Sequence, residues 1–302
     1  MGLHDKLHGT YTALVTPFVA DAAQSIDWPA FDALIETQIA GGISGLVPCG
    51  TTGESPTLSH DEHKAVIRRT VTRAAGRVQV VAGTGSNSTL TAIELSRDAE
   101  SAGADAVMAV VPYYNRPTQE GLCRHFLAVA RSVKCRVVIY NVPARTGIDL
   151  SPDTLGRICA DAPNVVGVKE ATGNVLRAQE LVRRFGSRLA VLSGDDALTL
   201  AMIATGARGV ISVTSNVLPA AVARATRLAL EGNLEAARRA HHALLPVHEA
   251  MFLEANPGPA KAALALRGVM QDVLRGPLCS ASEATKKLLA AALAAYSEQE
   301  KT

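Results

Sequence analysis

The chain lacks the features that mark several classes of protein. Its formal net charge is only +2 over 302 residues, which gives no electrostatic basis for binding nucleic acid or an anionic membrane. Residues 1–10 contain no apolar signal core and no myristoylation site. The longest late apolar run, Leu288 to Tyr296, is too short to span a bilayer. We therefore expect neither a nucleic-acid partner nor a membrane partner.

Cysteine pairs and cofactor motifs are missing as well. The five cysteines are scattered and form no C-x-x-C pair, so we interpret them as reduced thiols of a cytoplasmic protein. The histidines of "HDEH" (60–63) do not have the spacing of H-E-x-x-H, and no metal is expected there. The segment "GTGSN" (83–87) lacks the Lys-Ser/Thr of a P-loop and the third glycine of a dinucleotide fingerprint. The sequence thus predicts no cofactor.

What the chain does contain is a regular alternation of strand and helix signals. Apolar runs typical of buried strands occur at 11–17, 45–50, 78–85, 105–113, 136–143, 165–170, 189–195 and 209–215. Helix-start signals lie between them: Ser59 with Glu62 predicts a capping box, and Ser151 before Pro152 predicts an N-cap. Eight such units predict an α/β fold, a (β/α)8 TIM barrel over residues 1–232. Residues 233–302 have no strand signal and are predicted to form a helical appendage packed on the barrel.

Polar residues and glycines collect where the predicted strands end, which is where barrel enzymes place their chemistry. Strands two, four, five, six and seven end in "GTTGES", "PYYN", "YNVPARTG", Lys169 and "SGDD". We interpret Asp195 and Asp196 of the last segment as caps of the following helix. The ends of the strands therefore indicate one shared site at the mouth of the barrel.

Lys169 is the candidate nucleophile of that site. Strand alternation would place Val165, Gly167 and Lys169 on one face, with the glycine leaving space beside the lysine. A lysine at a strand end usually bends out to water. Inside a barrel mouth, however, desolvation would lower its pKa and free the amine to attack a carbonyl.

Neighbouring strand ends supply the groups that such a reaction needs. Tyr140 shares a face with Val138 and can point at the same axis, where its hydroxyl could pass protons. Thr51 and Thr52, in a glycine-flanked turn, offer hydroxyls and backbone N–H groups suited to a small carboxylate. The alternative is that "GTTGE" is only a turn between a strand and a helix.

Eight motifs follow one another along the chain: "GTTGES", "AGTGSN", "PYYNRPTQEGL", "YNVPARTG", "VKEATGN", "SGDD", "GVISVTSN" and "EANPGPAK". Taken together, they resemble the 4-hydroxy-tetrahydrodipicolinate synthase (dihydrodipicolinate synthase) family of the N-acetylneuraminate lyase-like class I aldolases. The resemblance implies condensation of pyruvate with L-aspartate-4-semialdehyde through a lysine Schiff base, in lysine biosynthesis. It also implies a homotetramer built as a dimer of dimers.

The resemblance implies a role for each candidate residue. Lys169 matches the Schiff-base lysine and Tyr140 the tyrosine that moves protons at the imine. Thr51 and Tyr114 match the two residues that relay protons with that tyrosine. The family counterpart of Tyr114 reaches over from a neighbouring subunit. The substrate-binding positions are matched by Thr52, Ile211, Gly194 and Arg145, of which Arg145 would hold the carboxylate of the semialdehyde.

A regulatory site is implied as well. Feedback-inhibited members of the family bind L-lysine at a subunit interface, and the matching positions here are Ser55, His60, His63, Asn87 and Tyr113. The position that carries a glutamate in lysine-sensitive members is Thr91 in this chain. A hydroxyl cannot neutralise an ammonium group, so the site is expected to be vestigial.

Two alternatives belong beside the synthase. N-acetylneuraminate lyases share the lysine and the tyrosine, but Arg145 within "PARTG" and the double threonine favour the synthase. A catalytically silent barrel that only binds a ligand is the other alternative. It is disfavoured because it would have no need of Lys169, Tyr140, Thr51 and Tyr114 together.

Overall fold

The computed structural model describes residues 7–299 and places eight parallel strands within them. They are β1 Gly9–Ala13, β2 Gly45–Val47, β3 Gln79–Gly83, β4 Ala106–Val110, β5 Arg136–Asn141, β6 Val165–Glu170, β7 Ala190–Ser193 and β8 Gly209–Ser212. The strands follow one another in chain order around a closed barrel, and β1 pairs with both β2 and β8. The predicted (β/α)8 barrel is therefore confirmed, with the first strand displaced toward the N-terminus.

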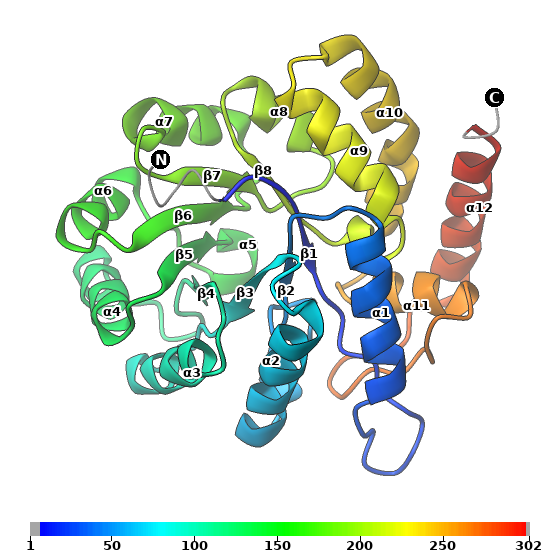
Figure 1. Ribbon diagram of the computed structural model, residues 1–302, viewed down its shortest axis with the longest axis horizontal. Helices are drawn as coiled ribbons and strands as arrows, with labels where there is room; N and C mark the ends of the chain where they lie inside the picture. Colours follow the sequence, from blue (N-terminus) through cyan, green and yellow to red (C-terminus); the bar gives the residue numbers. More distant parts are fainter. Residues whose placement is uncertain (1–6, 300–302) are drawn as a thin grey trace.

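Helices surround the barrel on the outside, as Figure 1 shows. They are α1 Trp28–Ala40, α2 His60–Ala74, α3 Thr89–Ser101, α4 Gln119–Ser132, α6 Pro152–Asp161, α7 Val175–Phe185, α8 Thr199–Ala204 and α9 Pro219–Leu230. Two predicted helix starts are confirmed. Ser59 Oγ accepts the N–H of Glu62 while the Glu62 carboxylate accepts the N–H of Ser59, and Ser151 Oγ accepts the N–H of Thr154.

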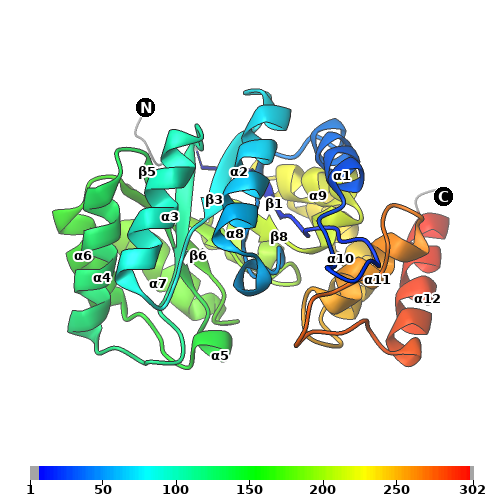
Figure 2. The ribbon, with the colours of Figure 1, turned by 90° about the horizontal axis from the view of Figure 1, so that it is seen from below.

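The C-terminal part of the described chain is helical. It contains α10 Leu234–Ala250, α11 Gly258–Leu266 and α12 Glu283–Gln299. Figure 2 shows α11 and α12 at one side of the barrel, beyond α10. None of the helices in residues 7–299 has the length and apolar character needed to cross a membrane.

A bulge in β6 corrects one expectation about the strand that carries Lys169. Val137 pairs with Val165 but the next residue, Val138, pairs with Gly167, which leaves Val166 as an extra residue in β6. As a result Val165 packs in the outer core and Val166 in the barrel interior. The expectation that Val165 shares a face with Lys169 is therefore wrong.

The space beside Gly167 is also not open. A Cβ atom at this glycine would lie 3.0 Å from Cδ1 of Leu7 and 3.3 Å from Cγ2 of Val138. The fully buried Leu7 side chain comes from the segment before β1 and belongs to the barrel interior. The absent side chain therefore makes room for Leu7, which fills the interior below the lysine.

Candidate active site

Lys169 lies inside the mouth of the barrel and does not bend out to water. Only 6% of the residue is exposed, and its Nζ is 4.3 Å from the centroid of the Tyr140 ring. The two residues pair directly across β5 and β6. Burial lowers the pKa of Lys169 to about 8, the nearby positive charge of Arg145 acts in the same direction, and the negative charge of Asp196 opposes it. A substantial fraction of the amine is thus neutral near physiological pH.

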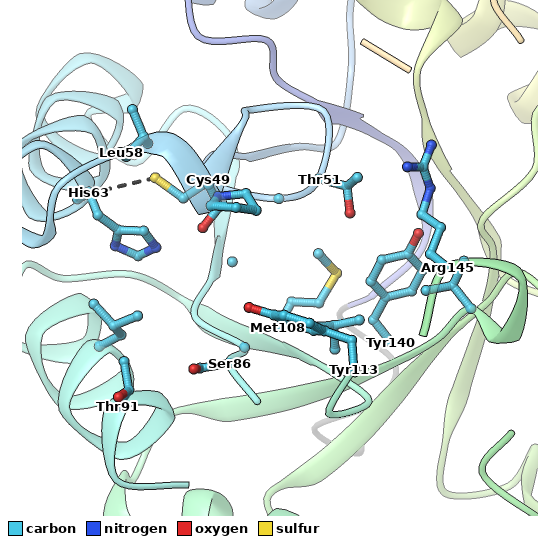
Figure 3. Close-up of a pocket in the computed structure, with 18 of the residues that line it drawn as sticks. Cys49, Thr51, Leu58, His63, Ser86, Thr91, Met108, Tyr113, Tyr140 and Arg145 are labelled. Atoms are coloured by element: carbon cyan, nitrogen blue, oxygen red, sulfur yellow. Dashed lines mark hydrogen bonds between the residues drawn. The ribbon is translucent and has the colours of Figure 1, made fainter. Parts of the chain in front are cut away.

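Tyr140 of β5 and Thr51 of the turn after β2 lie beside each other. Tyr140 is buried near the end of β5, and burial raises the pKa of its hydroxyl, while the charge of Arg145 and a hydrogen bond with Thr51 lower it. Figure 3 shows Thr51, Tyr140 and Arg145 around one end of a pocket. A protonated phenol in contact with a second hydroxyl and beside an amine can carry protons to and from that amine.

Arg145 is placed by the short helix α5 Pro143–Thr146, which follows β5 directly. The helix ends at Gly147, whose φ of 72° is the left-handed conformation that glycine adopts without strain. The N–H of Gly147 closes the turn on the carbonyl of Pro143. Arg145 is exposed and lines the same pocket as Tyr140.

The remaining predicted substrate positions lie around the lysine or deeper in the barrel. Ile211 is buried in the barrel interior, and Thr52 is buried in the turn after β2, where its hydroxyl accepts a hydrogen bond from Nδ2 of Asn256 at 2.9 Å. A Cβ atom at Gly194 would lie 2.6 Å from Cβ of Ala171 and 3.2 Å from Cε of Lys169. Only glycine at this position leaves the lysine side chain its space.

Tyr114 is the predicted catalytic residue that this chain does not bring into its own site. It is 90% exposed and has a φ of 71°, a conformation that is unusual for a residue with a side chain. The side chain is therefore open to solvent in this chain.

Neither Asp195 nor Asp196 is the N-cap of α8, so that expectation is wrong; Asp195 Oδ1 accepts the N–H of Ala197 at 3.0 Å, in the turn before the helix. The N-cap of α8 is Leu198, which makes no side-chain hydrogen bond. Instead the buried Asp196 accepts the backbone N–H groups of Val213 and Thr214 at 2.8 and 3.1 Å. It thereby fixes the turn after β8. Its negative charge also acts on Lys169, where it opposes the lowering of the pKa. Sequence reasoning missed this role because the residues that it joins lie in different βα units.

The pocket at the mouth has a volume of about 360 Å³ and extends from Tyr140 toward α2 and α3. Most of the predicted lysine-site positions line it, namely Ser55, His60, His63 and Tyr113, and so does Thr91. Figure 3 shows His63 and Thr91 at the opposite end from Arg145. Burial lowers the pKa of His63 to about 4 and keeps its ring neutral. Asn87 does not line the pocket; its carbonyl accepts a hydrogen bond from Asn115.

Comparison with known proteins places this architecture in a family. The chain matches the dihydrodipicolinate synthetase family over residues 6–296. It is 61% identical to the 4-hydroxy-tetrahydrodipicolinate synthase of Sorangium cellulosum, over 95% of each chain. The synthase of Methylacidiphilum fumariolicum SolV has 45% identity and a TM-score of 0.94, covering 97% of this chain and 96% of that one. The DHDPS of Cyanidioschyzon merolae, solved with lysine bound, has 36% identity and a TM-score of 0.93, covering 97% and 99%. This chain belongs to the dihydrodipicolinate synthetase family.

Proposed function

We propose that this protein is a 4-hydroxy-tetrahydrodipicolinate synthase, which condenses pyruvate with L-aspartate-4-semialdehyde in the first committed step of diaminopimelate and lysine biosynthesis. The observation that carries the proposal is the buried Lys169 against the Tyr140 ring, in a chain of this family. Its relatives over nearly the full length bear the same enzyme name.

The residues perform the reaction in a defined order. The neutral amine of Lys169 attacks the ketone carbon of pyruvate, and loss of the ketone oxygen as water leaves an imine. Loss of a methyl proton gives an enamine, whose carbon adds to the aldehyde of the semialdehyde. The amino group of that substrate then attacks the imine carbon, closes the ring and releases Lys169. Tyr140, in contact with Thr51, is the group that moves the protons.

Substrate binding falls to the polar groups around the lysine. Thr52, Gly194 and the backbone of Ile211 bind pyruvate, and Arg145 at the entrance binds the carboxylate of the semialdehyde. The exposed Tyr114 enters the site of a neighbouring subunit, so the enzyme is an oligomer, and the family resemblance favours a homotetramer.

We place the enzyme in the cytoplasm because all five cysteines are free. We infer that the described part of the predicted appendage, residues 233–299, is a helical region packed on the barrel; residues 300–302 lie outside the described residues.

The proposed function is tested by comparing two aldehyde substrates as partners for pyruvate. With pyruvate present, aspartate semialdehyde should be turned over at least about a thousandfold more efficiently than N-acetylmannosamine, because the entrance offers a guanidinium to a carboxylate. The measurement is kcat/KM for each acceptor in a coupled assay. Preference for the sugar would identify a sugar-acid lyase instead.

Replacing Arg145 with alanine should separate the two substrates. We expect kcat/KM for the semialdehyde to fall about 30- to 100-fold, since a charge-assisted hydrogen bond contributes about 2–3 kcal/mol. Arg145→Lys, which keeps the charge but loses the planar fork, should lie between wild type and Arg145→Ala. If borohydride trapping of pyruvate fell as much as overall turnover, the assignment of Arg145 to the acceptor would be wrong.

Feedback inhibition by L-lysine should be weak or absent, because Thr91 provides no negative charge at the far end of the pocket. Loss of that charge costs about 1–3 kcal/mol, or about one to two decades in affinity. Thr91→Glu should strengthen inhibition in a dose–response assay at saturating pyruvate, whereas the uncharged Thr91→Gln should not. The glutamate fits the helix start, since Ser88 at the N-cap of α3 would then face a glutamate three residues later. Half-inhibition of the wild type by submillimolar lysine would contradict the prediction.

A further inference from the structure

The turn that carries Thr52 is held by a segment from the other end of the chain. Asn256, in the loop between α10 and α11, donates from its Nδ2 to Oγ1 of Thr52 at 2.9 Å, across 204 positions of sequence. Both side chains are buried. The hydroxyl of Thr52 is thus oriented by a fixed neighbour rather than by water.

The direction of this hydrogen bond decides what Thr52 can do. A threonine hydroxyl has one hydrogen to donate and two lone pairs that accept. Because the amide of Asn256 occupies one of the lone pairs, the hydroxyl hydrogen stays available for another partner. A carboxylate only accepts hydrogen bonds, so this is the orientation that a bound substrate carboxylate requires.

The loop of Asn256 is itself anchored. The carboxylate of Glu254, two residues earlier, accepts the hydroxyls of Ser282 and Thr285 at 2.6 Å each, where α12 begins. The side chain of Asn256 is therefore presented by a loop tied to a helix start. An anchored donor holds the Thr52 hydroxyl in place at a smaller entropic cost than a mobile one.

The same turn is fixed at a second point. Glu54, two residues after Thr52, is buried with a left-handed φ of 54°. Its carboxylate forms an ion pair with the buried Lys261 and accepts the backbone N–H of Arg275 at 3.0 Å. Residues after position 250 thus determine both the position of the turn and the direction of its hydroxyl.

We propose that Asn256 is a positioning residue of the pyruvate site, which sets the Thr52 hydroxyl so that its hydrogen faces the carboxylate of the substrate. The inference rests on the proposed function, in which Thr52 binds pyruvate. It gives the C-terminal segment a part in substrate binding besides its packing on the barrel.

Measuring kcat/KM for each substrate separates a role of Asn256 in pyruvate binding from a role in folding alone. In Asn256→Ala, kcat/KM for pyruvate should fall about tenfold, the equivalent of one hydrogen bond to a charged group, while kcat/KM for the semialdehyde stays within about twofold. A loss of folded enzyme would lower both values equally. Asn256→Asp should be worse for pyruvate, by about a hundredfold, because its carboxylate would take the hydroxyl hydrogen and repel the substrate.

Two further variants complete the experiment. Asn164→Ala, which removes a partly buried asparagine that bonds three carbonyls at the opposite end of the barrel, should leave kcat/KM for pyruvate unchanged. In a Thr52→Val background, Asn256→Ala should cause no further loss. If Asn256→Ala fails to fold, the near-isosteric Asn256→Asp carries the test.

Several results would overturn the inference. They are an equal fall in both kcat/KM values, full additivity with Thr52→Val, or a milder effect of Asn256→Asp than of Asn256→Ala. The last would mean that Thr52 donates to residue 256. A wild-type enzyme that gives no borohydride-trapped pyruvate adduct on Lys169 would instead reject the proposed function itself, so the two failures are distinguishable.

Discussion

Replacing Lys169 with alanine should lower turnover by about four orders of magnitude or more, the usual consequence of removing a covalent nucleophile. Borohydride reduction in the presence of pyruvate should attach a reduced adduct to Lys169 of the wild type and to no residue of the variant. The fold should survive, because burial disfavours the charged form of this amine and its removal relieves that cost. Peptide mass spectrometry that located the adduct on another lysine would contradict the mechanism.

Two controls separate nucleophilicity from charge and from generic lysine chemistry. Lys169→Arg keeps a positive charge, but a guanidinium stays protonated and cannot form the imine, so it should be as inactive as the alanine variant. Lys134→Ala removes an exposed lysine just before β5 and should leave both turnover and the adduct unchanged. Activity retained in Lys169→Arg would show that the residue acts only through its charge.

The pH dependence follows from the same burial. Only the neutral amine attacks pyruvate, and its pKa is lowered to about 8, so kcat/KM for pyruvate should rise with pH and level off above that value. Arg145→Ala removes a positive charge that favours the neutral amine, and it should move the midpoint to higher pH. Asp196→Asn removes the opposing negative charge and should move it to lower pH. A wild-type profile that is still rising steeply at pH 10 would contradict the burial effect.

Features that depend only on residues close together in the chain can be predicted from this sequence. The eight strands follow from apolar runs that are buried on both faces, and the position of Lys169 follows from its place at the end of one of them. The capping box at Ser59 was equally readable, because its two partners lie three residues apart. These features need only the chemistry of neighbouring residues.

Features that depend on packing between segments far apart in the chain could not be predicted from the sequence. The extra Val166 in β6 has no sequence signal, since a run of valines fits either face of a buried strand. Leu7 fills the gap at Gly167 from a segment that only the closed barrel brings there. Asp196 and Asn256 bond partners in other units of the fold, and a single sequence does not indicate such pairs. The groups that tune the site were therefore harder to predict than the groups that react.

Lys261 provides the strongest stability prediction. Within residues 7–299 it is a fully buried cation: its ammonium pairs with Glu54, donates to the carbonyl of Val273 at 2.9 Å and lies 4.1 Å from the centroid of the Phe18 ring. Lys261→Met has a similar length but leaves the carboxylate of Glu54 buried without its cation. Breaking a buried pair in this way typically lowers the free energy of unfolding by about 3–5 kcal/mol. Urea denaturation at fixed protein concentration measures the loss.

A second C-terminal lysine offers the matched control. Lys286 pairs with Asp272 and Glu283 at 3.1 Å each on a partly exposed side chain, so Lys286→Met should cost no more than about 1 kcal/mol. The double variant Glu54→Gln/Lys261→Met removes both charges and should be more stable than Lys261→Met alone, because most of the penalty comes from the unpaired carboxylate. If Lys261→Met were no more destabilising than Lys286→Met, water would be solvating Glu54 and the pair would not be buried. The turn after β2 would then lose its fixed point at Glu54, and the orientation of Thr52 would depend on Asn256 alone.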